Sequence, residues 1–76
     1  MITVKLYGLL RLDSGIKERS MEAATIREVL DGLAQLGIDR KALSGCVIIV
    51  NGKSGTKRTM LNPGDVVQLL PPVAGG

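Results

Sequence analysis

The chain has 76 residues, which suffices for one small domain with a single hydrophobic core and is too short for two. Apolar residues make up 45% and charged residues 22% of the sequence, a balance typical of a folded domain. The formal net charge is only +3, and Tyr7 is the one aromatic residue. These values disfavour nucleic acid as a partner, because its binding relies on dense positive charge or on stacked aromatic rings.

The sequence contains no histidine and a single cysteine, Cys46. Histidine-dependent nucleophiles and general bases are therefore excluded, and one cysteine forms neither an intrachain disulfide nor a multi-cysteine metal site. We predict no metal and no bound cofactor. No apolar run approaches the roughly 20 residues of a membrane span, and the first residues lack the pattern of a secretory leader. We expect a cytoplasmic protein that does not bind membranes.

The first predicted element is a strand at residues 1–7, in which Ile2, Val4 and Leu6 occupy alternate positions. Residues 8–15 have glycine at both ends and an Asp-Ser-Gly turn signal, so we expect the chain to reverse there. Residues 16–21 fit a more polar second strand, paired with the first at an edge of the sheet.

A helix is predicted for residues 25–36. Thr25 and Glu28 have the spacing of a capping box, and Gly37 suits the left-handed position that ends a helix. Gly32 costs about 1 kcal/mol relative to alanine inside a helix, so it either permits a close approach or is merely tolerated. Apolar residues recur at intervals of three and four, as expected for one buried face: Ile26, Val29, Leu30, Leu33 and Leu36.

Residues 38–45 favour a connection with one short helical turn. Residues 46–50 are five apolar residues in a row, mostly β-branched, which is typical of a strand covered on both faces or largely buried. Asn51-Gly52 indicates a type I′ hairpin turn, because both central residues need a positive φ. The polar residues 53–60 then predict a short, irregular returning strand.

A second turn is predicted at residues 62–65, Asn-Pro-Gly-Asp, followed by a last strand at residues 66–70 that two prolines end. One helix cannot cover both faces of such a sheet. The order of elements therefore predicts an α+β domain of the β-grasp type over residues 1–70, with a curled mixed sheet of four to five strands packed on one main helix. The first and last strands should be neighbours, with the last strand near the middle of the sheet.

Residues 71–76, Pro-Pro-Val-Ala-Gly-Gly, have no evident folding role, and we expect an extended, flexible tail. The two prolines prevent further strand pairing. Gly75 and Gly76 carry no side chain, so they present the terminal carboxylate with little hindrance and can enter a narrow channel. The simpler alternative is an ordinary frayed terminus.

Residues 62–76, NPGDVVQLLPPVAGG, closely resemble the C-terminus of the molybdopterin synthase small subunit, in the MoaD/ThiS family of ubiquitin-like sulfur carrier proteins. The hairpin VNGK at residues 50–53, the first strand MITVKLYG and the overall length also agree. The sequence departs from this pattern at Leu69 and Leu70, where relatives often carry aromatic residues.

The resemblance implies a sulfur carrier that is not catalytic alone. An adenylating enzyme of the ubiquitin-activating type would use ATP to activate the carboxylate of Gly76, and a sulfur donor protein would convert it into a thiocarboxylate. The large subunit of molybdopterin synthase would then take the tail, and the sulfur would pass to a pterin precursor. Contacts with these partners are expected from the tail and its root: Gly75, Ala74, Val73, Pro72, Pro71, Leu69 and Tyr7.

Two other functions remain open. The chain could be a carrier or protein modifier for another pathway, such as thiamine thiazole synthesis, or a non-catalytic β-grasp interaction domain with an inert tail. Cys46 could carry a persulfide, but its apolar neighbours favour a buried core position. Lys53, Lys57 and Arg58 favour a solvated loop over a phosphate site.

Overall fold

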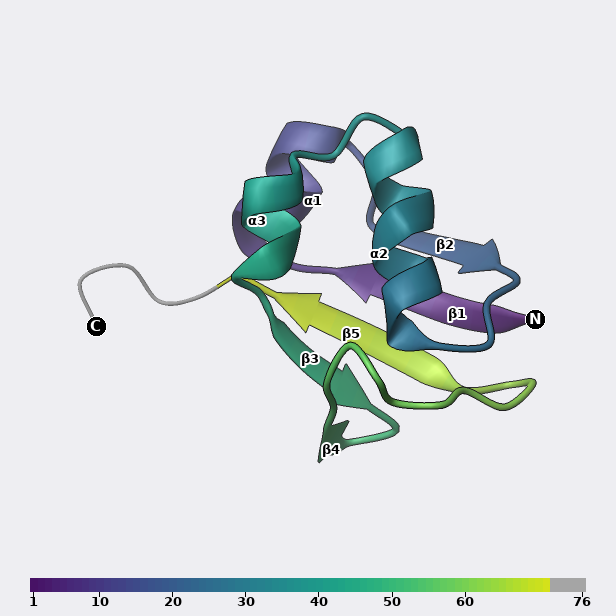
Figure 1. Cartoon of the computed structure of the whole chain (residues 1–76). Helices are drawn as coiled ribbons and strands as arrows, with labels where there is room; N and C mark the ends of the chain where they lie inside the picture. The colour runs from purple at the N-terminus through teal and green to yellow at the C-terminus, as the bar shows by residue number, and fades with distance from the viewer. Residues whose placement is uncertain (72–76) are drawn as a thin grey trace.

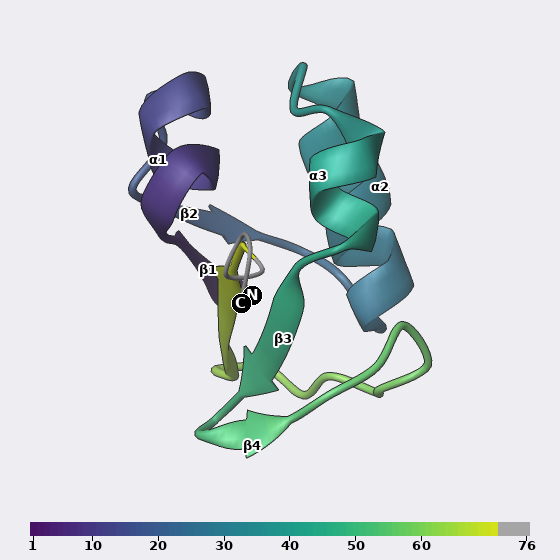
Figure 2. The same cartoon turned by 90° about the vertical axis from the view of Figure 1, so that its left-hand side faces the viewer.

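The computed structural model describes residues 1–71, which form a mixed β-sheet with helices on one of its faces (Figure 1). The strands are β1 (Ile2–Leu6), β2 (Glu18–Met21), β3 (Val47–Val50), β4 (Lys53–Ser54) and β5 (Val66–Leu70). The helices are α1 (Gly8–Ser14), α2 (Ile26–Gln35) and α3 (Arg40–Ser44). A view turned by 90° shows α1 on one side and α2 with α3 on the other, all above the sheet (Figure 2).

The strand order in the sheet is β2-β1-β5-β3-β4. β5 lies at the centre, parallel to β1 and antiparallel to β3, and the remaining pairs are antiparallel. The predicted β-grasp arrangement of α+β class, with the first and last strands as neighbours, is confirmed.

The core lies between the sheet and the helices. Alternate residues of β1 and β5 face it, as the period of a strand requires, and Val4, Val67 and Leu69 have no exposed surface. α2 contributes the predicted apolar face: Ile26, Val29, Leu30 and Leu33. Each such side chain contributes roughly 1.5–3 kcal/mol through burial, so these four positions fix α2 on the sheet.

The ends of α2 follow the sequence prediction. The Thr25 hydroxyl accepts a hydrogen bond from the Glu28 amide at 3.3 Å, and the Glu28 carboxylate accepts one from the Ala24 amide at 3.0 Å. At the other end, Gly37 has a φ of 100° and its amide donates to the Ala34 carbonyl. The Thr25 cap and the glycine terminator are therefore both present, while the Glu28 carboxylate reaches the amide of Ala24, one residue before the cap, instead of that of Thr25.

Residues 8–15 differ from the prediction, because the expected reversal is made by the helix α1. Gly8 and Gly15 have φ values of 58° and 73°, so the two glycines interpreted as turn residues begin and end a helix. Leu10 of this helix is buried in the core. The layer of helices that covers the sheet therefore contains two short helices, α1 and α3, in addition to the main helix α2. The single helical turn predicted within residues 38–45 corresponds to α3.

β3 is also less buried than its apolar sequence suggests. Ile48 and Val50 pack against the core, while Val47 on the opposite face of the sheet is 49% exposed. Its uninterrupted apolar sequence therefore does not reflect burial on both faces. β4 is only two residues long, which confirms the short returning strand.

The turns at the far end of the sheet are tied together by side chains. Asn51 and Gly52 have positive φ values of 51° and 83°, as a type I′ turn requires. The Asn51 amide group donates to Asp65 at 2.9 Å and its carbonyl oxygen accepts from the Val66 amide. Hydrogen bonds from the Asn62 backbone and the Asn51 side chain lower the pKa of the Asp65 carboxyl. Asp65 is thus a turn residue in this structure.

Gly32 lies where α2 approaches β2. A Cβ atom at this position would stand 2.6 Å from the Cε atom of Met21, the end of a flexible side chain that can move aside. We predict that Gly32→Ala raises the free energy of unfolding, by up to about 1 kcal/mol, because the gain in helix propensity exceeds the cost of shifting Met21. Urea denaturation measures the change; a loss of stability would show that Met21 cannot move.

Candidate functional site

The predicted site residues fall into two groups. Pro72, Val73, Ala74, Gly75 and Gly76 lie outside the residues that the structure describes. Tyr7, Leu69 and Pro71 lie within them, at the end of the sheet where the parallel strands β1 and β5 both finish. We call this end of the sheet, from which residues 71–76 continue, the root of the tail.

Hydrogen bonds fix the backbone at the root. The Tyr7 amide donates to the Leu69 carbonyl at 3.2 Å, which extends the pairing of β1 and β5 beyond the two strands. The Tyr7 hydroxyl accepts a hydrogen bond from the Gln68 side-chain amide at 2.8 Å, on the face of the sheet away from the helices. These two bonds hold Tyr7 against the end of β5, so the chain leaves the sheet from a fixed position.

Gly8 is in contact with the first residue of the tail. A Cβ atom on Gly8 would lie 2.7 Å from Cγ and 3.3 Å from Cδ of Pro71, and a proline ring has little freedom to move away. Gly8 also has a φ of 58°, which L side chains rarely adopt. Both the backbone and the neighbouring ring therefore require glycine here. Sequence reasoning missed this role, because it depends on a contact between opposite ends of the chain.

Leu69 does not face a partner in this structure. Its side chain has no exposed surface and packs in the core, in register with Leu6 and Ile48. The alternation of strand side chains places the half-buried Leu70 on the open face instead. The expected contact of Leu69 with a partner is therefore wrong for this conformation, because Leu69 is a core residue and Leu70 is its neighbour on the open face.

The open face of the sheet carries an apolar strip beside the root. Val47 and Leu70 pair across β3 and β5, and Ile49 pairs with Gln68 one step further from the root. Tyr7 lies on the same face through its bond to Gln68. No helix of the described chain covers this strip (Figure 2). A face of this kind can dock a partner that receives the tail.

Cys46 lies just before β3 and is half-buried against the core. Its Sγ atom donates a hydrogen bond to the Leu43 carbonyl at 2.9 Å, and burial raises the pKa of its thiol. The thiolate is the nucleophilic form of cysteine, so this environment opposes a persulfide role and favours the packing role predicted from the sequence.

Residues 1–71 hold no cluster of three or more acidic, cysteine or histidine side chains suited to a metal ion. Within the same residues no charged or polar side chain is buried. None of the described helices is both long and apolar enough to cross a bilayer.

The strand order and the helices on one face of the sheet define the class of ubiquitin-like β-grasp proteins. The ThiS family model matches residues 4–76, and the chain belongs to the ThiS family. It is accordingly a ubiquitin-like sulfur carrier of the ThiS/MoaD type, whose members are small subunits that work with partner proteins. A comparison with curated protein sequences gives no match.

Solved structures share the whole fold. A chain of the complex of subunits 1 and 2 of molybdopterin-converting factor from Helicobacter pylori is 27% identical, with a TM-score of 0.72 over 99% of this chain and 97% of that one. A chain of the BexX/CysO complex of Amycolatopsis orientalis is 26% identical, with a TM-score of 0.80 and full coverage of both chains. The small archaeal modifier protein 1 from Methanosarcina acetivorans is 24% identical, with a TM-score of 0.84 over 99% of this chain and 95% of that one.

The contact between Gly8 and Pro71 leads to a stability prediction. Gly8→Ala should cost about 2–3 kcal/mol, because it combines an unfavourable φ with displacement of the Pro71 ring. Gly15→Ala is the matched control, since Gly15 also has a positive φ but no atom lies within 4 Å of its added Cβ. It should cost only about 1 kcal/mol. Equal losses in urea denaturation would show that the Pro71 ring gives way freely.

The environment of Cys46 leads to a second prediction. Cys46→Ala should retain sulfur transfer and lose about 1 kcal/mol of stability, because the smaller side chain leaves the core less well filled. A thermal melt beside a reconstituted sulfur-transfer assay measures both effects. Loss of transfer by a variant that melts normally would restore the persulfide hypothesis.

Proposed function

We propose that the chain carries sulfur for molybdopterin synthesis, as the small subunit of a molybdopterin synthase. Gly76 is adenylated, converted into a thiocarboxylate, and donates its sulfur to a pterin precursor. One observation carries the proposal: the segment ending in Gly-Gly begins at Pro71, at the end of the central strand of a β-grasp domain. The family match supports the carrier chemistry, and the likeness to a molybdopterin-converting factor chain supports the pathway.

The chemistry at the terminus needs an activating step, because a carboxylate is a poor electrophile. The carboxylate of Gly76 attacks the α-phosphorus of ATP, and pyrophosphate leaves. A persulfide of the donor protein then attacks the acyl carbon of the adenylate, and AMP leaves. A thiol reduces the resulting acyl disulfide, which releases the terminal thiocarboxylate. The activating enzyme consumes the ATP, so the carrier needs no nucleotide site of its own.

Three partners follow from this sequence of steps: an adenylyltransferase of the ubiquitin-activating type, a sulfur donor protein and the large synthase subunit. Each of them handles the same terminus, so each docks near the root of the tail. The apolar strip of Tyr7, Val47 and Leu70 lies there and is available on the open face. Aliphatic Leu70 offers less contact area than an aromatic residue would, so binding depends more on the neighbouring positions.

A second candidate is a carrier or modifier that serves another pathway. An acyl-adenylate at Gly76 is open to attack by an amine as well as by sulfur, and attack by a lysine would give an isopeptide bond. The similarity to a chain of the BexX/CysO complex supports this second candidate, because the chain resembles it about as closely as it resembles a chain of the molybdopterin-converting factor. The acceptor molecule distinguishes the two candidates.

The carrier proposal predicts that the terminus itself is indispensable. Deleting Gly76, or adding one alanine after it, should abolish sulfur transfer in a reconstituted synthase assay and leave the thermal melt unchanged. The control carries the same added alanine at the N-terminus and should remain active. Undiminished transfer by the C-terminally extended chain would contradict the proposal.

The modification can also be seen directly in the Cys46→Ala background, which removes the competing thiol. Incubation with the activating enzyme, ATP and a sulfur donor should raise the intact mass by about 16 Da. Alkylation by iodoacetamide must then label the C-terminal peptide, because methionine oxidation changes the mass by a similar amount without creating a nucleophilic sulfur.

A further inference from the structure

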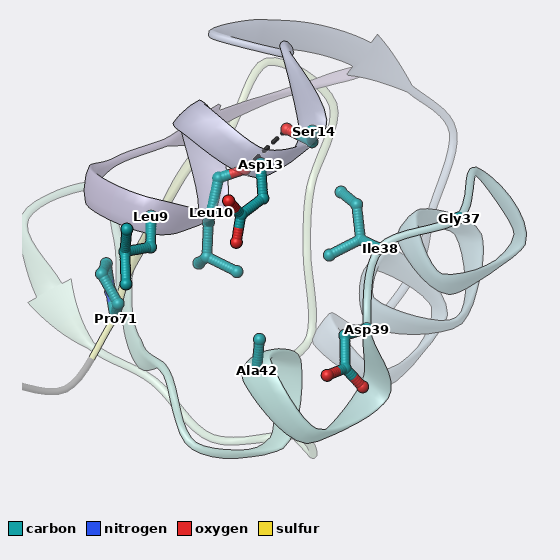
Figure 3. A pocket seen from close by; sticks show the side chains of 9 residues that line it. All are labelled: Leu9, Leu10, Asp13, Ser14, Gly37, Ile38, Asp39, Ala42 and Pro71. Carbon is teal, nitrogen blue, oxygen red and sulfur yellow. Dashed lines mark hydrogen bonds between the residues drawn. The ribbon is translucent and has the colours of Figure 1, made fainter.

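A groove of about 390 Å³ lies between α1 and the segment that leads into α3, and Figure 3 shows the side chains that line it. Both α1 and α3 lie on the side of the sheet opposite its open face (Figure 2). Leu10 of α1 and Ile38 of the facing segment line its inner side (Figure 3), and they are core residues, only 3% and 9% exposed. Ala42 of α3 forms part of the far wall, and Leu9 lies at one end beside Pro71. The apolar groove therefore reaches the residue from which the tail begins.

The charge of the groove is opposite to that of the whole chain. Asp13 and Asp39 lie among its nine lining residues, none of which is basic, although the chain has a net charge of +3. The Asp13 carboxylate points into the groove (Figure 3). Asp39 accepts a hydrogen bond from the Lys41 amide, and neither carboxylate forms an ion pair within residues 1–71.

Leu9 is the exposed part of this surface. The Leu9 side chain is 64% exposed. Leu12 is the other large exposed apolar residue of α1, with an exposed fraction of 74%. Leu9 lines the groove and Leu12 does not. An exposed leucine that is continuous with an apolar groove, as Leu9 is, is typical of a surface that a partner covers.

We propose that this groove binds a segment of the tail-receiving protein in which leucine-like side chains are combined with arginine or lysine. The apolar side chains pack against the accessible lining residues Leu9, Ala42 and Pro71, and the cation lies against Asp13 and Asp39. The identity of that protein rests on the proposed function, whereas the chemistry of the segment rests on the groove alone. Residues 72–76 of the chain itself are a poor match, since they include neither leucine nor a basic residue.

Continuity with Pro71 gives the groove a role in docking. Pro71 lines the groove and also contacts Gly8 at the start of α1. A partner segment seated in the groove therefore touches the root of the tail from the side opposite the strip of Tyr7, Val47 and Leu70. Contacts on two sides fix the direction in which the tail enters the partner, which lowers the ordering cost of its insertion.

The probe for a direct test is a capped hexapeptide of leucine, alanine and arginine, LRALRL, with LEALEL as its charge-reversed counterpart. Titration into the ¹⁵N-labelled full chain should shift the amide signals of residues 8–14 and 37–42, and LEALEL should not. Leu9→Ala should weaken the binding of LRALRL about threefold to tenfold, and Leu12→Ala, the matched control on the same helix, should not change it.

The charge is tested by Asp13→Asn combined with Asp39→Asn, in which asparagine preserves the shape of each side chain and the cap of α3. This pair should weaken the binding of LRALRL by at least threefold. The control removes two carboxylates that do not line the groove, by Glu18→Gln and Glu22→Gln, and should leave the affinity unchanged. Equal binding of both peptides, shifts confined to the open sheet face, or no shifts at residues 8–14 and 37–42 would overturn the proposal.

These measurements separate the groove from the carrier chemistry. Peptide binding requires no activated terminus, so a functional groove on a chain that never forms a thiocarboxylate would refute the proposed function alone. If the chain forms a thiocarboxylate normally but does not bind LRALRL, the proposal for the groove alone is refuted.

Discussion

The pairing of β5 with β1 and β3 is the constraint on which the rest of the structure depends. Thr3 pairs with Val66, almost the whole length of the chain away, and Val50 pairs with Val67 on the other side. This central position buries Val67 and Leu69 beneath the helices. It also means that the chain emerges from the middle of the sheet, between two strands that cannot move apart without loss of the core. A tail attached there has a rigid base.

Local patterns predicted most of the fold, because most of its elements obey one period or one turn chemistry. The helix α2 was evident from its cap, its apolar face and Gly37, and both turns were evident from Asn51-Gly52 and from residues 62–65. α1 was missed because glycine at both ends of a short segment indicates a turn equally well. Its helical form depends on the burial of Leu10 in the core. That burial is a tertiary contact, and no local sequence pattern predicts it.

The site was predictable only in part, for the same reason. The Gly-Gly terminus is a property of the sequence and needed no structure. The assignment of Leu69 depended on the face of β5, and a strand of five consecutive apolar or amide residues, VVQLL, gives little indication of which face is buried. The roles of Gly8 and of the groove depend on Pro71 lying beside α1, a contact between the two ends of the chain.

The central place of β5 has a consequence for how such a carrier is made. During synthesis the emerging chain holds β1, the helices and β3 before β5 exists, so the two halves of the sheet have nothing to join them. A product of interrupted translation that ends before residue 66 therefore lacks the middle of its sheet as well as its terminus. Folding of the domain and completion of the segment after β5 are thus acquired together, and an incomplete chain exposes apolar surface that proteases recognise.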